Sequence, residues 1–145
     1  MQDTLALENK KLVGAFVNEV FVKRNLSDLD RYMRGDYIQH NPMAKQGMDG
    51  FRKFFADWFN AVPNWNYTLK KIVAERDEVW VYGTYAGKLK KTWLGIAPRG
   101  QKYAYDAVDI FRIEDHRIAE HWDVMDVYEL YRQLGALAER RKKAA

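Results

Sequence analysis

YDAVDIFRIEDHRIAEHWDVMD, residues 105–126, is the stretch that decides the fold. Apolar and polar side chains alternate on both sides of the polar turn Glu114–Arg117, and this period of two predicts a β-hairpin. The alternation places Asp109 on one face of the first strand, and His121 with Asp123 on one face of the second. An unpaired charge is costly in such apolar runs. If both faces lie on the same side of the sheet, two acids and an imidazole meet in one candidate site.

The rest of the chain predicts helices first and strands afterwards. Apolar periodicity predicts a helix over about residues 4–24, and an aromatic-rich helix that begins after Gly47 and ends before Pro63. Between them, Ser27 is expected to cap a short helix that Gly35 ends. Four further elements are expected: strands at Trp65–Glu75 and Val79–Gly87, a flexible connection at Lys88–Lys102, and a helix at about Val127–Arg140. This order is typical of an α+β fold.

The composition indicates one folded domain that spans residues 1–145. Hydrophobic residues make up 48% of the chain and aromatic residues 14%, which argues against disorder. Cysteine is absent, which excludes disulfides and thiol nucleophiles, and no signal peptide or membrane-spanning run is evident, so we expect a cytoplasmic protein. The net charge of +4 equals the four basic residues Arg140–Lys143. We therefore expect a frayed tail at 140–145, and neither nucleic-acid nor membrane binding.

Several segments resemble the SnoaL-like polyketide cyclases, a family of the nuclear-transport-factor-2-like superfamily. The hairpin is similar to the terminal hairpin of that family, and three other segments fit it: YIQHNP at Tyr37–Pro42, LGIAPRG at Leu94–Gly100 and QLG at Gln133–Gly135. The resemblance implies a cone-shaped α+β barrel, in which a curved, mostly antiparallel sheet wraps around the N-terminal helices. It also implies a homodimer packed through the outer face of the sheet. The fold hosts many functions, so activity has to be argued from the site.

Asp123 and Asp109 are the candidate proton-transfer groups. Asp123 falls where the resemblance places the acid/base aspartate of SnoaL-like cyclases, and burial would raise its pKa toward the range useful near neutral pH. Asp109 matches the oxyanion-stabilising aspartate of ketosteroid isomerases, a known example of a protonated acid. His121 is a candidate to orient or protonate the reacting groups. The structural alternatives are that Asp123 accepts a hydrogen bond or faces solvent, that Asp109 pairs with His121, and that His121 is a satisfied core histidine.

The expected substrate-binding residues come from four parts of the chain: His40, Asn41, Phe55, Trp58, Phe59, Trp93 and Met125. Asn41 aligns with the general-base aspartate of ketosteroid isomerases, and an amide cannot abstract a proton, so the steroid-isomerase mechanism is disfavoured. Asn41 can still hold a substrate carbonyl or a water. His40 fits pocket lining and a structural turn contact about equally. The aromatic stripe fits the core as well as a pocket wall.

Neither a metal nor an organic cofactor is expected. The three histidines lack HxH or HxxxH spacing, and no GxSxG, GxGxxG or P-loop pattern is present. The resemblance to the SnoaL-like cyclases implies the leading hypothesis, a cofactor-free cyclase or isomerase that acts on a small apolar carbonyl substrate through Asp-mediated proton transfer and aldol-type ring closure.

Two alternatives stay open. One is epoxide hydrolysis of the limonene-epoxide-hydrolase type, in which an arginine links the two aspartates and a tyrosine helps to place the water. Ala107 and Gln39 occupy the matching positions, and both departures count against this reaction. The other alternative is a non-catalytic domain of the same fold that binds a small molecule or a partner.

Overall fold

The computed structural model describes residues 3–137. Helical segments and strands follow in this order: α1 (Thr4–Phe16), the π-helical turn η1 (Val17–Val22), the 3₁₀ turn η2 (Leu29–Arg31), β1 (Met33–Gln39), α2 (Gly47–Ala61), β2 (Asn66–Glu75), β3 (Glu78–Lys88), β4 (Lys102–Glu114), β5 (Arg117–Met125) and α3 (Val127–Gln133). The expected first and third helices and the expected strands are thus confirmed.

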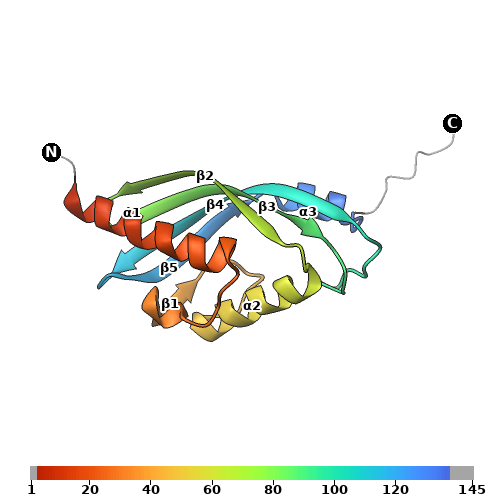
Figure 1. Cartoon of the computed structure of the whole chain (residues 1–145), viewed down its shortest axis with the longest axis horizontal. Helices are drawn as coiled ribbons and strands as arrows, with labels where there is room; N and C mark the ends of the chain where they lie inside the picture. The colour runs from red at the N-terminus through yellow and green to blue at the C-terminus, as the bar shows by residue number, and fades with distance from the viewer. Residues whose placement is uncertain (1–2, 138–145) are drawn as a thin grey trace.

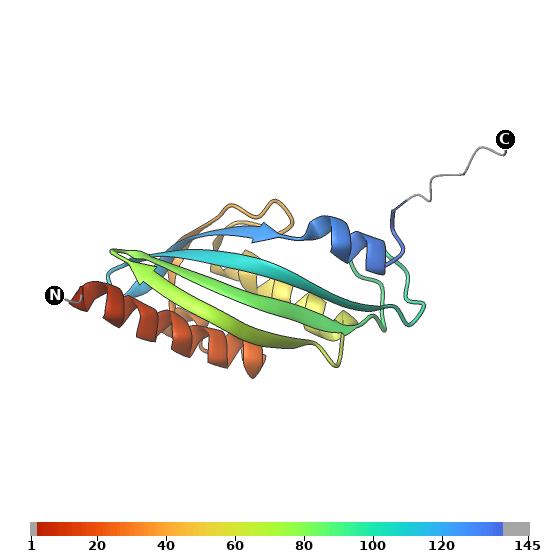
Figure 2. The same ribbon diagram turned by 90° about the horizontal axis from the view of Figure 1, so that it is seen from above.

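A curved sheet of five strands forms one layer of the fold, in the order β1-β5-β4-β3-β2. β1 runs parallel to β5, and the other neighbours are antiparallel. α1 and α2 lie together against one face of the sheet, whereas α3 follows β5 at the far end and packs beside β4 (Figures 1 and 2). This arrangement confirms the expected cone-shaped α+β fold.

The β4–β5 hairpin has the geometry that its sequence predicts. Asp115 and His116 form the tip, with φ angles of 49° and 57°, and positive φ at both central residues is the signature of a two-residue type I′ turn. This turn sets the pairing near the tip, and a β-bulge beside Ala119 shifts the register by one residue, so that Asp109 stands directly opposite Asp123. The inward residues of β4 are almost all buried, so the alternation assigns the faces correctly.

The aromatic core explains one glycine in the middle of the sheet. The ring of Tyr67 on β2 lies against Gly83 on β3, where a Cβ atom would collide with the tyrosine hydroxyl. Tyr67 in turn packs on Phe21 of η1, with ring centroids 5.2 Å apart. The helices and the sheet therefore meet through interlocked rings, which is the dense packing expected of a protein interior.

Two helix predictions are wrong in extent. Between α1 and α2 only the single 3₁₀ turn η2 forms; Ser27 does not cap it, and Gly35 lies inside β1. β1 extends back to Met33 because this segment pairs with β5, so tertiary hydrogen bonding overrides the local helix signal. The last helix, α3, ends at Gln133 because Gly135 follows with a φ of 73°. The expected frayed tail at 140–145 lies outside the described residues. Within residues 3–137, no helix is long and apolar enough to cross a bilayer.

Candidate active site

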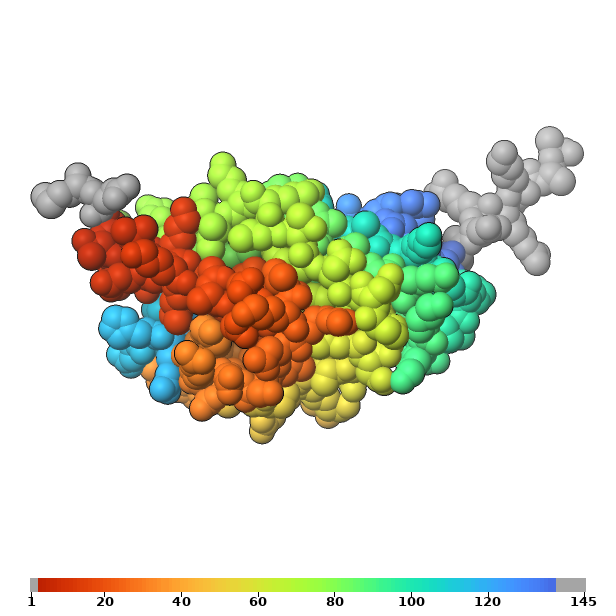
Figure 3. Space-filling view, in the orientation of Figure 1, coloured from red at the N-terminus to blue at the C-terminus, as the bar shows by residue number. Residues whose placement is uncertain are grey.

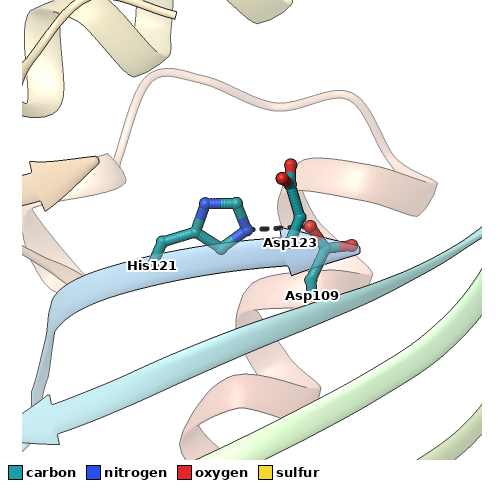
Figure 4. A group of neighbouring side chains, drawn as sticks. All are labelled: Asp109, His121 and Asp123. Atoms are coloured by element: carbon teal, nitrogen blue, oxygen red, sulfur yellow. Dashed lines mark hydrogen bonds and ion pairs between the residues drawn. The ribbon is translucent and has the colours of Figure 1, made fainter. Parts of the chain in front are cut away.

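Asp109, His121 and Asp123 converge on the inner face of the β4–β5 hairpin (Figure 4). Their side chains line one pocket between the sheet and α2. Asp109 and His121 are only 4% and 5% exposed, whereas Asp123 is partly exposed. The expected convergence of two acids and an imidazole on one interior face is confirmed.

Both carboxylate oxygens of Asp109 are used in hydrogen bonds. Oδ1 lies 2.8 Å from Nε2 of His121, and Oδ2 accepts a hydrogen bond of 2.7 Å from the hydroxyl of Tyr85. Tyr85 belongs to β3, which pairs with β4 on the side away from β5. Three adjacent strands therefore hold the Asp109 carboxyl group, and such a buried group is stable only when it is paired in this way.

Gln39 determines which nitrogen of His121 carries a proton. The side-chain oxygen of Gln39 accepts the backbone N–H of Asn41 at 2.9 Å, so this atom must be the oxygen and not the amide nitrogen. The same oxygen lies 2.8 Å from Nδ1 of His121, which must therefore donate. The Gln39 amide nitrogen donates to the hydroxyl of Tyr37 at 2.8 Å, which holds the amide in this orientation.

Because Nδ1 of His121 carries a proton, the contact between Nε2 and Asp109 contains one further proton. This proton resides on the imidazole or on the carboxyl group, and in either case the pair has no net charge. The contact thus confirms the structural alternative in which Asp109 pairs with His121.

Asp123 is the less satisfied of the two acids. Its Oδ2 accepts a short hydrogen bond of 2.6 Å from the side-chain nitrogen of Asn41, whereas Oδ1 has no hydrogen-bond partner within residues 3–137. Burial raises the pKa of the Asp123 carboxyl group and the nearby Asp109 raises it further, against the lowering effects of His121 and of the Asn41 hydrogen bond. A carboxyl group with a raised pKa and one free oxygen is suited to accepting and returning a proton.

Aromatic and apolar side chains enclose the polar cluster. The walls include Phe55 and Trp58 from α2, Trp93 from the β3–β4 connection, and Met125 from β5. The indole rings of Trp58 and Trp93 stack with centroids 4.8 Å apart. The space open to the centre of a water molecule is only about 30 Å³. In the space-filling view, atoms of α1 and α2 close over the face of the sheet that they cover (Figure 3).

The model of the SnoaL-like polyketide cyclases matches residues 11–134, which include every residue of the polar cluster. The chain belongs to this family. The SnoaL-like chain is 30% identical, over 118 residues, to the nogalonic acid methyl ester cyclase of Streptomyces nogalater; the match covers 74% of this chain and 84% of the relative.

Solved structures agree with this membership. TsrD from Streptomyces laurentii is 31% identical and superposes with a TM-score of 0.82, over 94% of this chain and all 100% of that one. An epoxide hydrolase of M. tuberculosis, similar to limonene epoxide hydrolase, superposes with a TM-score of 0.68 at 18% identity, over 89% of this chain and 90% of that one. At that identity, the second likeness concerns the fold alone.

Two of the expected substrate-binding residues of this SnoaL-like chain lie outside the pocket. His40 follows Gln39, and alternation turns it to the outer side, where it stacks on Trp122 and its Nε2 lies 2.8 Å from Glu120. Phe59 sits behind the pocket wall and packs edge-on against Trp65, with centroids 4.7 Å apart. The predictions of pocket lining for His40 and Phe59 are therefore wrong, whereas five others do line it: Asn41, Phe55, Trp58, Trp93 and Met125.

Sequence reasoning did not assign Gln39, Tyr85 or Tyr105 to the site. Gln39 stands two residues before Asn41 and therefore shares its face of the extended segment, a signal that was available. Tyr105 lies on the inward face of β4, four residues before Asp109, so the period-of-two alternation was a signal for it. Tyr85 is its register partner on β3, and only the pairing of these strands places Tyr85 beside the hairpin acids.

The polar cluster also has the chemistry of a possible metal site. One ligand atom from each of Asp109, His121 and Asp123 lies within 4.8 Å of the others. Carboxylates and imidazole together suit several divalent cations. A metal bound by Asp109 Oδ1 and His121 Nε2 would have to replace the hydrogen bond that joins these two atoms. The donor set fits a cation, but only after this rearrangement.

Proposed function

We propose that this protein catalyses an intramolecular aldol-type ring closure of a small polyketide-like carbonyl compound, with Asp123 as the proton-transfer group. One observation carries the proposal: Asp123 presents a free carboxylate oxygen and a raised pKa in an apolar pocket. Membership of the SnoaL-like family and the cyclase relatives support the reaction class.

In the first step, Asp123 takes a proton from the carbon next to a substrate ketone, and the electron pair of the broken C–H bond forms an enolate. The enolate carbon then attacks a second carbonyl carbon of the same molecule and forms the new C–C bond. The oxygen of that second carbonyl becomes an alkoxide, which takes back the proton from Asp123. No atom is gained or lost, and Asp123 returns to its starting state.

The residues around Asp123 have supporting roles in this mechanism. Asn41 holds one oxygen of the carboxylate, so that the other oxygen faces the substrate. The Asp109–His121 pair carries no net charge and lies within 4.8 Å of Asp123, where its dipoles stabilise developing negative charge. The aromatic walls fold the substrate and hold its reacting carbons together.

Substrate access requires the pocket to open, because about 30 Å³ holds only a water or two. Met43, Ala44 and Phe54 line both the pocket and a neighbouring surface depression, so they form the partition between the two spaces. A displacement of this partition would join the spaces without disturbing the hairpin. If the partition stays closed, the alternative of a domain that binds only small ligands gains support.

The proposal is tested with nogalonic acid methyl ester, the compound in the name of the Streptomyces nogalater relative. An aldol closure gives a product of unchanged mass and changed chromatographic retention. Wild-type protein should form this isomer with and without EDTA, and the surface variant Asp30→Asn should match it, because Asp30 is an exposed residue of η2 that lines neither the pocket nor the depression. Isomer formation no faster than in buffer, for this ester and for related polyketide esters, would contradict the proposal.

We also propose that two copies pair through the outer face of the sheet. Two rows of apolar side chains cross β3, β4 and β5 in register on this face: Trp80, Ile110 and Trp122 in one row, and Tyr82, Val108 and Val124 in the other. Trp80 and Val124 are 46% and 67% exposed, an unusual exposure for large apolar groups that are gathered in one place.

A further inference from the structure

Most polar side-chain atoms of the pocket already have hydrogen-bond partners. The side chains of Asp109, His121 and Gln39 have every nitrogen and oxygen engaged. Asn41 donates to Asp123 and accepts from the backbone of Met43. Within residues 3–137, two carboxyl or hydroxyl oxygens of the pocket have no partner: Oδ1 of Asp123, which the proposed mechanism uses, and the hydroxyl of Tyr105, which it does not use.

Tyr105 combines deep burial with an unsatisfied donor. The residue is 3% exposed, lines the pocket, and its hydroxyl has no hydrogen-bond partner within the described chain. Buried donors without partners are rare in folded proteins, because each one loses its hydrogen bonds to water and receives nothing in return. A ligand that supplies an acceptor would remove this cost.

The position of Tyr105 relative to the acids favours a ligand that spans both. Tyr105 lies four residues before Asp109 on the same face of β4, and the small side chain of Ala107 stands between them. Its register partner Tyr85 occupies the matching place on β3 and donates to Asp109, and the two rings stack with centroids 5.6 Å apart. One tyrosine of the pair is therefore committed to the acid, and the other is left free.

Burial raises the pKa of the Tyr105 hydroxyl well above its usual value of 10, and the neighbouring Tyr103, Asp109 and Asp123 act in the same direction. The hydroxyl therefore keeps its proton at any physiological pH and can serve only as a neutral donor or an acceptor. The pocket already offers a ligand one hydrogen-bond acceptor, the free carboxylate oxygen of Asp123. What it still lacks is a hydrogen-bond donor, which the Tyr105 hydroxyl can supply.

We infer that the Tyr105 hydroxyl donates a hydrogen bond to a carbonyl oxygen of the bound substrate, an interaction that deepens the proposed cyclase function and rests on it. The inferred ligand is a flat, apolar molecule with one ketone oxygen at Tyr105 and an acidic C–H bond at Asp123.

The test uses 1-indanone and indane, two ligands of the same ring skeleton of which only the first has a carbonyl oxygen. Affinities are measured by titration of wild type, Tyr105→Phe and the matched control Tyr67→Phe. Tyr67 is also a buried tyrosine whose hydroxyl has no hydrogen-bond partner among residues 3–137, but it does not line the pocket. Wild type and Tyr67→Phe should prefer 1-indanone by roughly 2–10-fold, the value of one ordinary hydrogen bond, and Tyr105→Phe should lose this preference.

Infrared spectroscopy gives a second readout that needs no difference in affinity. The carbonyl stretch of bound 1-indanone should lie at lower frequency in wild type than in Tyr105→Phe. A preference for the ketone that survives in Tyr105→Phe, or no preference in wild type, overturns the inference. These measurements need no turnover, so they separate the two claims. If Tyr105→Phe loses the preference for the ketone but wild type does not cyclise the ester, the inference stands and the proposed function fails. If Tyr105→Phe cyclises the ester at the full wild-type rate, the proposed function stands and the inference fails.

Discussion

His121 and Asp109 share one proton across a contact of 2.8 Å. The proton count follows from Gln39, whose side-chain oxygen must accept from Nδ1 of His121. The pair therefore has no net charge, whether the shared proton resides on the imidazole or on the carboxyl group. Asp123, directly opposite Asp109 in the hairpin, is the carboxyl group with a free oxygen and a pKa that burial raises.

Gln39 should prove essential for this arrangement. Gln39→Met removes the acceptor for two buried donors, the Nδ1–H of His121 and the backbone N–H of Asn41, and should lower the free energy of unfolding by about 1–3 kcal/mol. Gln39→Glu keeps an acceptor for both donors and should recover part of the loss. Chemical denaturation of the three proteins measures the effect, and a methionine variant as stable as wild type would disprove the proton assignment.

Asp123 should give the stability of the protein a distinctive pH dependence. Its folded-state pKa lies above the ordinary value of 3.8, chiefly because the group is buried. Between the unfolded and folded pKa values the folded state binds more protons, so the contribution of Asp123 to the free energy of unfolding falls as pH rises from about 3.8. Asp123→Asn should lack this decline. Denaturation from pH 3 upward, compared with Asp30→Asn, checks the sign; parallel curves for wild type and Asp123→Asn would contradict it.

Epoxide hydrolysis should be slow or absent. Within residues 3–137 no arginine bridges Asp109 and Asp123, since Ala107 occupies the position of that residue, and the side chain of Gln39 is engaged with Tyr37 and His121. Limonene epoxide incubated with wild-type protein should give diol no faster than in buffer. Diol formation at rates comparable to those of a genuine epoxide hydrolase would place that reaction ahead of cyclisation.

The outer face of the sheet should control oligomeric state. Val124→Glu introduces a charge into the apolar row at a residue that is 67% exposed, and should convert a dimer into a monomer in analytical ultracentrifugation. Val22→Glu, at a residue of the same type that is 51% exposed on η1, provides the control and should remain dimeric. A monomeric wild type, or two variants that behave alike, would rule out this interface.

The hairpin was readable from the sequence because its side-chain period of two reports burial directly. The alternation around Asp109 and Asp123 indicated which residues face inward. The two-residue turn fixed the pairing near the tip, whereas the β-bulge beside Ala119, which brings Asp109 opposite Asp123, was not predicted. Residues outside such a pattern were harder to place. His40 was predicted to line the pocket because of its neighbours in the sequence. Adjacent residues of an extended segment point to opposite faces, however, so His40 lies on the face opposite that of Gln39.

Other parts of the site depend on contacts between segments that are distant in the sequence. Tyr85 enters the site only through the pairing of β3 with β4, and its local sequence carries no mark of it. Likewise, Met33 and Gly35 belong to a strand because β5 provides hydrogen-bond partners 85 residues later, as in the pair of Met33 with Ile118. Local propensity could not anticipate that pairing.

Asp123→Asn tests the central claim most directly, because it keeps the size of the side chain and an acceptor for Asn41 while it removes the titrating group. Cyclisation rate and melting temperature should be measured on the same preparation. We expect the rate to fall by about 10²–10⁴-fold, the usual contribution of general acid–base catalysis, at an unchanged or raised melting temperature. A variant that cyclises at the wild-type rate per folded molecule, with or without a lower melting temperature, would show that Asp123 is structural and would contradict the account.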